Sequence, residues 1–166
     1  MLLFVQNYRI RLATQNDAST VDRLSHVMGL SDGDEHQDTL EPMNDEHTWI
    51  VLENDSTAVI GAAYFGPEGH SDRVWNLYFL AVHPEHQRGG TGSALVAWVE
   101  ANLRQRGDEV AKLLLIDTSS VESFGPTRSF YKKLGYVEEA RVREYYGPGD
   151  DKVVFWKMLN PTTTAG

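Results

Sequence analysis

The chain has 166 residues, a length typical of a single domain with one hydrophobic core. Its 15 basic and 24 acidic residues give a net charge of −9, which disfavours binding to nucleic acid phosphates or anionic lipid, and the absence of cysteine excludes disulfides, thiolate metal sites and a cysteinyl intermediate. We therefore predict one domain over residues 8–160 with a flexible tail over 161–166, in a cytoplasmic protein with no nucleic acid or membrane partner.

The first predicted elements are a strand and a helix. Residues 8–12 alternate as a short strand, and Thr14 with Asp17 three positions later forms a capping-box pattern that starts a helix. Its expected buried stripe consists of Val21, Leu24 and Met28.

A polar loop and a hairpin follow. Residues 31–46 are polar and acidic, which predicts a loop or a short irregular helix on the substrate side. Two apolar runs, 49–53 and 58–65, are separated by Asn54-Asp55-Ser56, a spacing typical of an antiparallel hairpin.

The next segment predicts a parallel pair of strands. Residues 74–82 and 112–118 are almost continuously apolar, as in strands covered on both faces. Between them, Leu95, Val99 and Leu103 recur at helical spacing before Gly107, a plausible helix stop. Strand, helix and parallel strand form a βαβ unit.

The C-terminal part predicts a helix and a closing strand pair. The helix covers residues 126–134, with proline first and Gly135 just beyond its end. Residues 137–142 and 152–158 read as strands around a loop over 145–151. The whole order predicts an α+β or α/β domain of three layers on a mixed sheet.

The most informative stretch lies between the fourth strand and its helix. Gly89, Gly90 and Gly92 allow the backbone to approach a ligand and to direct several N–H groups at one point. The helix N-terminus and Arg88 add positive charge, so the loop favours an anion such as a diphosphate. A tight turn without a ligand is the alternative, because a glycine-rich turn alone is a weak signal.

Two nucleotide-binding motifs do not match this loop. A nucleoside-triphosphate P-loop ends in Gly-Lys-Ser/Thr, whereas Gly92 is followed by Ser93 and Ala94. A dinucleotide fingerprint would place glycine at position 95, occupied by Leu95, and would follow an early strand.

The sequence L-A-V-H-P-E-H-Q-R-G-G-T-G-S-A-L, residues 80–95, resembles the signature of the GNAT superfamily of acyl-CoA N-acyltransferases. Gln87, Gly90 and Gly92 occupy its defined positions, and residues 128–136 (R-S-F-Y-K-K-L-G-Y) resemble its second block. The resemblance implies a mostly antiparallel mixed sheet with a central parallel pair and helices on both faces. It also implies direct acetyl transfer from acetyl-CoA to a primary amine in a ternary complex.

The resemblance also implies the residues that bind the cofactor. Backbone N–H groups of the glycine loop would hold the diphosphate, and the pantetheine arm would pair like a strand with the end of the fourth strand. Further cofactor contacts would come from the fifth strand and the last helix. The resulting set is Leu80, Ala81, Val82, Gln87, Arg88, Gly89, Gly90, Thr91, Gly92, Ser93, Thr118, Phe130 and Tyr131.

Tyr131 is the predicted catalytic residue. In the superfamily that the sequence resembles, a tyrosine at this position protonates the departing CoA thiolate. If Phe130 and Leu134 face the core, Tyr131 is turned about 100° away from them, toward the cofactor. An ordinary packing tyrosine is the alternative.

The sequence leaves the identity of the general base open, since either a side chain or a water molecule could deprotonate the amine. Asn76 and Tyr78 share one strand face, and Asp117 ends the neighbouring strand. A water-relayed deprotonation is an equal alternative.

The acceptor is expected to be an amine, cationic in view of the acidic composition. Glu144, Asp150 and Asp151 could attract it, with an ordinary exposed acidic loop as the alternative reading. The histidines, including the pair His83 and His86, are expected to be solvated, and no metal is predicted. A homodimer is compatible with the sequence. Three alternative functions also stay open: a non-catalytic acyl-CoA-binding module, O-acylation, and transfer of another acyl group.

Overall fold

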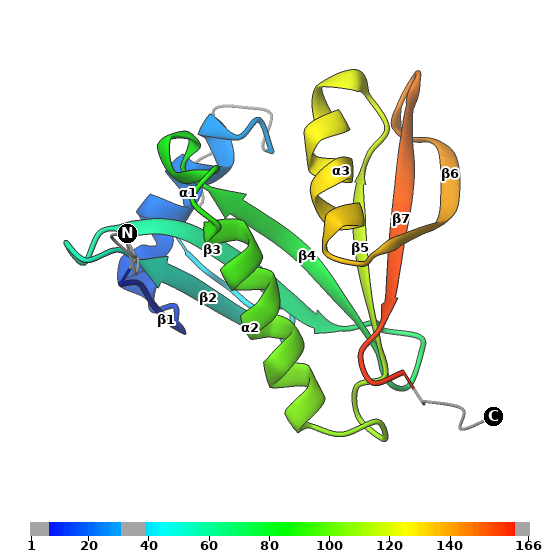
Figure 1. The fold of residues 1–166 in the computed structure, drawn as a ribbon, viewed down its shortest axis with the longest axis horizontal. Coiled ribbons are helices and arrows are strands. Elements are labelled where there is room, and N and C mark those ends of the chain that lie inside the picture. The colour runs from blue at the N-terminus through cyan, green and yellow to red at the C-terminus, as the bar shows by residue number, and fades with distance from the viewer. Residues whose placement is uncertain (1–6, 31–38, 162–166) are drawn as a thin grey trace, which may run out of the picture. The chain divides into compact units, whose positions relative to one another are not determined.

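The structure is a computed structural model of the chain and describes residues 7–30 and 39–161. In this described part, seven strands join one sheet in the order β1-β2-β3-β4-β5-β7-β6 (Figure 1). Short 3₁₀ turns precede each of the three α-helices. The elements are β1 (Arg9–Leu12), α1 (Ala18–Val27), β2 (Thr48–Glu53), β3 (Val59–Pro67), β4 (Val74–Val82), α2 (Thr91–Gln105), β5 (Leu113–Ser119), α3 (Gly125–Lys133), β6 (Val137–Gly147) and β7 (Asp150–Met158).

This order confirms the predicted succession of elements and the mixed sheet. β4 and β5 are the parallel pair, joined through α2, and the predicted hairpin of β2 and β3 is antiparallel. Residues 31–38 of the predicted substrate-side loop and residues 162–166 of the predicted tail lie outside the described residues. None of the described helices is long and apolar enough to cross a membrane.

The chain forms two compact units, Met1–Phe65 with Phe79–Val99 and Gly66–Tyr78 with Glu100–Gly166. In the first unit the predicted capping box of Thr14 and Asp17 is present at the helix entry. Helix α1 then contributes its apolar stripe to the core, although Met28 is only half-buried at the helix end. The core cluster comprises Ala18, Val21, Leu24, Leu40, Val51, Ala62 and Ala81.

In the second unit, β5 is paired along its whole length with β7, from Leu113 opposite Met158 to Ser119 opposite Lys152. Glu100 of α2 is buried and joins this helix to β7 and to the connection between α3 and β6. Its carboxylate accepts hydrogen bonds from Arg104 at 2.9 Å, from Lys157 of β7 at 2.9 Å and from the Tyr136 hydroxyl at 3.1 Å. A buried carboxylate is tolerated here because its charge is balanced and its oxygens are bonded.

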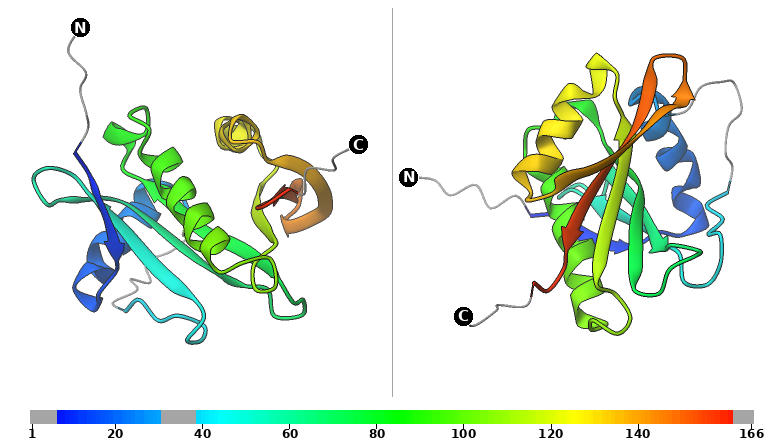
Figure 2. Two further views of the ribbon diagram at one scale, coloured as in Figure 1. Left: turned by 60° about the horizontal axis from the view of Figure 1, so that its bottom comes forward. Right: turned by 90° about the vertical axis from the view of Figure 1, so that its right-hand side faces the viewer.

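The predicted loop over residues 145–151 is wrong. β6 runs to Gly147 and β7 begins at Asp150, so only Pro148 and Gly149 form the turn of a long twisted hairpin (Figure 2). Proline followed by a glycine with φ of 75° is suitable for a tight turn, and register shifts within β6 absorb the remaining irregularity.

Candidate active site

The glycine loop of the first unit forms the start of α2. Gly90 has φ of 81°, in the left-handed region where a side chain would be strained. The hydrogen bond from Ala94 N to Gly90 O, at 3.0 Å, opens the helical pattern, so N–H groups earlier in the first turn have no helical acceptor. Together with the exposed guanidinium of Arg88, they are suited to hold an anion.

The side chain of Gln87 holds this loop in place. Its Nε2 donates to Val82 O at 3.2 Å, at the end of β4, and lies 2.8 Å from Sδ of Met28, at the end of α1. The amide nitrogen is therefore occupied within the protein. The predicted cofactor contact of Gln87, through its amide oxygen or its main chain, stays a prediction.

Gly61 is a residue that the sequence analysis missed. A Cβ there would lie 2.9 Å from Cδ1 of Leu95 and 3.4 Å from Cγ2 of Thr91. Strand β3 thus lets the first turn of α2 pack directly against it. A glycine inside an apolar strand is the signal that could have revealed this close approach.

The strand before the loop presents main chain rather than side chain. Ala81 and Val82 are buried, and Leu80 is half-buried. His83 N donates to Ile60 O of β3 at 2.8 Å, which fixes the point where the loop leaves the strand. The predicted strand-like pairing of these residues with pantetheine stays a prediction.

Tyr131 does not have the packing that its helix spacing suggested. It is the buried residue of α3, whereas Phe130 and Leu134 are only half-buried. Its ring contacts Tyr136 and Phe155, with centroids 6.2 and 5.7 Å away. The expectation that Phe130 and Leu134 form the core and leave Tyr131 outside it is wrong, because β7 and Tyr136 cover the tyrosine face of the helix.

Burial still gives the Tyr131 hydroxyl a chemical property. In the described part of the chain this hydroxyl makes no hydrogen bond, and burial raises its pKa above the usual 10. A phenol in this state keeps its proton over the whole physiological range, so the proton is available for donation to a base. The geometry is compatible with the predicted catalytic role, which stays a prediction.

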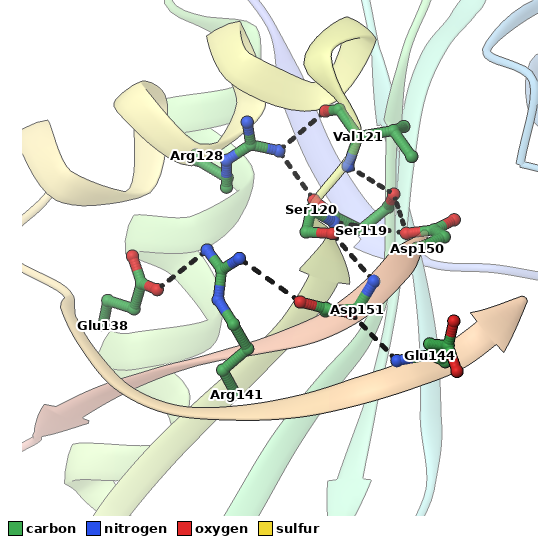
Figure 3. Close-up of polar contacts among 9 residues, drawn as sticks. All are labelled: Ser119, Ser120, Val121, Arg128, Glu138, Arg141, Glu144, Asp150 and Asp151. Atoms are coloured by element: carbon green, nitrogen blue, oxygen red, sulfur yellow. Dashed lines mark hydrogen bonds and ion pairs between the residues drawn. The ribbon is translucent and has the colours of Figure 1, made fainter. Parts of the chain in front are cut away.

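The end of β5 is held by a polar network (Figure 3). Ser119 Oγ donates to Asp150 Oδ1 at 2.5 Å, and Asp151 N donates to Ser120 Oγ at 2.7 Å. Arg128 of α3 donates to Ser119 O at 2.7 Å and to Val121 O at 2.9 Å. Thr118, the neighbouring predicted cofactor residue, is buried just before this network.

The carboxylates of Asp150 and Asp151 are therefore engaged within the protein. Beside the Ser119 contact of Asp150, Asp151 lies 3.4 Å from Arg141 and accepts from Glu144 N at 2.9 Å. Glu144 and Asp151 also line an open hollow of about 560 Å³, together with Arg143 and Gly149. The exposed-loop reading is wrong for Asp150 and Asp151, which order the β5 end.

Two of the three candidate bases, Asn76 and Asp117, are in contact in the second unit. Asn76 Nδ2 donates to Glu68 Oε1 at 2.7 Å and to Asp117 Oδ2 at 3.3 Å, and Lys152 Nζ lies 3.1 Å from Asp117. Glu68 and Lys152 were not predicted from the sequence, because neither lies in the strand that carries Asn76 and Tyr78. Tyr78 is exposed and donates to Pro67 O at 3.4 Å.

A metal could be held by the turn before the glycine loop. Ligand atoms of His83, Glu85 and His86 lie within 4.8 Å of one another. However, His83 Nδ1 accepts from Glu85 N at 3.3 Å, and these side chains are at least partly exposed. The absence of a metal stays a prediction.

Comparison with known proteins identifies the family. Residues 44–138, which include β4, the glycine loop, β5 and α3, match the acetyltransferase (GNAT) domain. The chain belongs to the GNAT acetyltransferase family.

Solved structures with similar folds cover nearly the whole chain. A GNAT-family protein from Desulfovibrio desulfuricans matches with 26% identity, TM-score 0.79, over 93% of this chain and 100% of its own. An aminoglycoside 6'-N-acetyltransferase complexed with coenzyme A matches with 20% identity, TM-score 0.71, over 92% and 98%. The protein yncA from Salmonella typhimurium, solved with its cofactor acetyl-CoA, matches with 19% identity, TM-score 0.70, over 96% and 98%.

Proposed function

We propose that the chain is an acetyl-CoA-dependent N-acetyltransferase that passes the acetyl group directly to a primary amine in a ternary complex. The observation that carries this proposal is the glycine loop at the start of α2, with Gly90 at φ of 81° and first-turn N–H groups without helical acceptors. Coenzyme A and acetyl-CoA in two structures of the same fold support it.

The diphosphate of acetyl-CoA fits the loop because an anion supplies the acceptors that the first turn of α2 lacks. Gly90 and Gly92 leave the approach free of long side chains, and exposed Arg88 adds a full positive charge. Gln87 keeps the loop in this shape through its contacts to Val82 O and Met28.

The chemistry follows from the residues that are present. The chain has no cysteine, so an acyl-cysteine is excluded, and we infer direct attack by the neutral amine on the thioester carbonyl. As the tetrahedral intermediate collapses, the C–S bond breaks and the sulfur leaves as a thiolate. We assign its protonation to the Tyr131 hydroxyl, which burial keeps protonated until this step. The proton that the attacking nitrogen loses passes to water, and water returns a proton to the tyrosine.

Two measurements test this function. Acetyl-CoA at a hundredfold excess over its dissociation constant should add about 2.7 kcal/mol to stability and raise the melting temperature by roughly 5–10 °C. A library of primary amines should then release CoA thiol, with the acetylated product showing an amide rather than an ester.

The outcomes separate the alternatives. An unmoved melting curve at saturating acetyl-CoA contradicts the proposal at its first step. A higher melting temperature without turnover of any amine would identify a non-catalytic binding module. A larger rise in melting temperature with a longer acyl-CoA would indicate that this longer thioester is the acyl donor.

A further inference from the structure

An asparagine in the second unit has a buried acceptor without a partner. Asn76 is 1% exposed, and its Oδ1 has no hydrogen bond. The two ends of the amide can be told apart by their partners. Nδ2 donates to the carboxylates of Glu68 and Asp117, which only accept hydrogen bonds, so Oδ1 cannot occupy that position. A buried acceptor without a donor costs about 1–3 kcal/mol, so this arrangement calls for an N–H or O–H group from elsewhere.

The charges around Asn76 favour a positively charged hydrogen-bond donor for Oδ1. Lys152 Nζ pairs with Asp117 at 3.1 Å and lies 4.5 Å from the centre of the Tyr145 ring, which holds it on that carboxylate. In the described part of the chain Glu68 has no ion pair. The group of Glu68, Asp117 and Lys152 therefore carries a net charge of about −1 at neutral pH.

The position of Asn76 in the sheet makes this group a suitable binding site. Asn76 opposite Leu115 is the last pair of the parallel ladder in the described residues, although β5 continues to Ser119. Because Nδ2 and Oδ1 belong to one planar amide, Oδ1 is no farther from each carboxylate than one hydrogen bond plus the width of the amide group. Glu68 and Asp117 are half-buried, so a ligand can reach their carboxylates from solvent, and it reaches the covered Oδ1 once a neighbouring side chain moves.

We propose that Asn76 and Glu68 bind the acceptor as a singly charged primary ammonium, in an inference that rests on the proposed function. Asn76 Oδ1 accepts one N–H, and the Glu68 carboxylate supplies the opposite charge. Asn76 is then a specificity-determining residue that selects N–H donors, and Glu68 selects the charge. Uncharged alcohols and quaternary ammonium ions each lack one of the two features.

Three small probes separate these features by NMR in solution. The side-chain N–H signals of Asn76, assigned by their loss in Asn76→Ala, are followed during titration with n-butylammonium, 1-butanol and tetramethylammonium. We expect saturable shifts with n-butylammonium and at least tenfold weaker effects with the other two. Signals unmoved by n-butylammonium, or equal responses to all three probes, would overturn the site and leave an ordered water as the partner of Oδ1.

A matched pair of variants tests the charge without disturbing the amide. Glu68→Gln keeps an oxygen that can accept from Asn76 but removes the charge, and it should weaken n-butylammonium binding about tenfold or more. Asp72→Asn removes an exposed carboxylate from the same connection between β3 and β4 and should change binding less than twofold. Equal losses in both variants would reduce the effect to general electrostatics and refute the role of Glu68.

These readouts are independent of acetyl transfer. If n-butylammonium binds at Asn76 but the protein acetylates no amine, the proposed binding site is supported and the proposed function is rejected. Turnover of an amine whose Michaelis constant is unchanged in Glu68→Gln would reject the site and retain the function. If both hold, Glu68→Gln should raise the amine's Michaelis constant about tenfold and leave that of acetyl-CoA within twofold.

Discussion

A Cβ on Gly61 of β3 would lie only 2.9 Å from Cδ1 of Leu95 and 3.4 Å from Cγ2 of Thr91 in α2, so Leu95 and the first-turn residue Thr91 pack against a strand residue that has no side chain. The same turn supplies the N–H groups of the proposed diphosphate site. Packing in the core of the first unit and the cofactor loop are therefore connected through one glycine.

We expect Gly61→Val to lower the free energy of unfolding by about 1–3 kcal/mol, the usual cost of overpacking, and to weaken acetyl-CoA binding. Urea unfolding and an acetyl-CoA titration measure the two effects. Gly69→Val is the control, because a Cβ at Gly69 meets nothing within 4 Å. Equal stability of the two variants would show that α2 can shift without cost.

Gly90→Asp should abolish the melting shift caused by acetyl-CoA, because it places a negative side chain on the loop that is proposed to hold phosphate. Gly107→Asp is a close control. Both glycines have positive φ, 81° and 82°, and a Cβ at either meets nothing within 4 Å, so the backbone strain is similar. A full acetyl-CoA shift in Gly90→Asp would remove the loop from the cofactor site.

Tyr131→Phe should lower turnover by roughly 10²–10⁴-fold, the range for general acid catalysis, and leave acetyl-CoA affinity within a few-fold. Burial holds the pKa of Tyr131 above 10, so deprotonation of this hydroxyl should not produce an activity loss between pH 7 and 10. A chemistry-limited assay across this pH range measures both effects.

Tyr136→Phe serves as the control for Tyr131→Phe. The Tyr136 hydroxyl donates to buried Glu100 at 3.1 Å, so its loss should cost about 1–3 kcal/mol of stability and change turnover little. If Tyr131→Phe instead behaves like Tyr136→Phe, with reduced stability and a normal rate, Tyr131 is a packing residue.

Acid should weaken the first unit through Asp17. Hydrogen bonds from Arg11, at 2.8 and 2.9 Å, are the main cause that lowers the pKa of Asp17 below the usual value of an aspartate. A lowered pKa in the folded state contributes stability above about pH 4, and this contribution is lost as the pH falls through the folded value.

Asp17→Asn should therefore cost about 1–3 kcal/mol at pH 7, and its difference from the unsubstituted protein should shrink below about pH 4. Urea unfolding at several pH values measures this trend. Asp55→Asn, at an exposed turn position, should stay within about 0.5 kcal/mol at every pH. A difference for Asp17→Asn that persists unchanged at pH 2 would assign the effect to packing instead of charge.

The sequence by itself determined the order of the elements, the parallel pair of β4 and β5, and the glycine loop. These features depend on signals within a few neighbouring residues, namely apolar periodicity, the capping pair of Thr14 and Asp17, and glycines before a helix. The hairpin limits were missed because the acidic, exposed residues of β6 lack a strand's alternation, and their pairing with β7 decides their conformation.

Only the tertiary structure decided which side chains meet. Asn76 and Asp117 are 41 positions apart, and Ser119 and Asp150 are 31 apart, so no local pattern could pair them. The burial of Tyr131 likewise depends on Tyr136 and Phe155, which the helix spacing does not include. Local preference sets each element's conformation, but hydrogen bonds and burial between distant segments arise only when the whole sheet has formed.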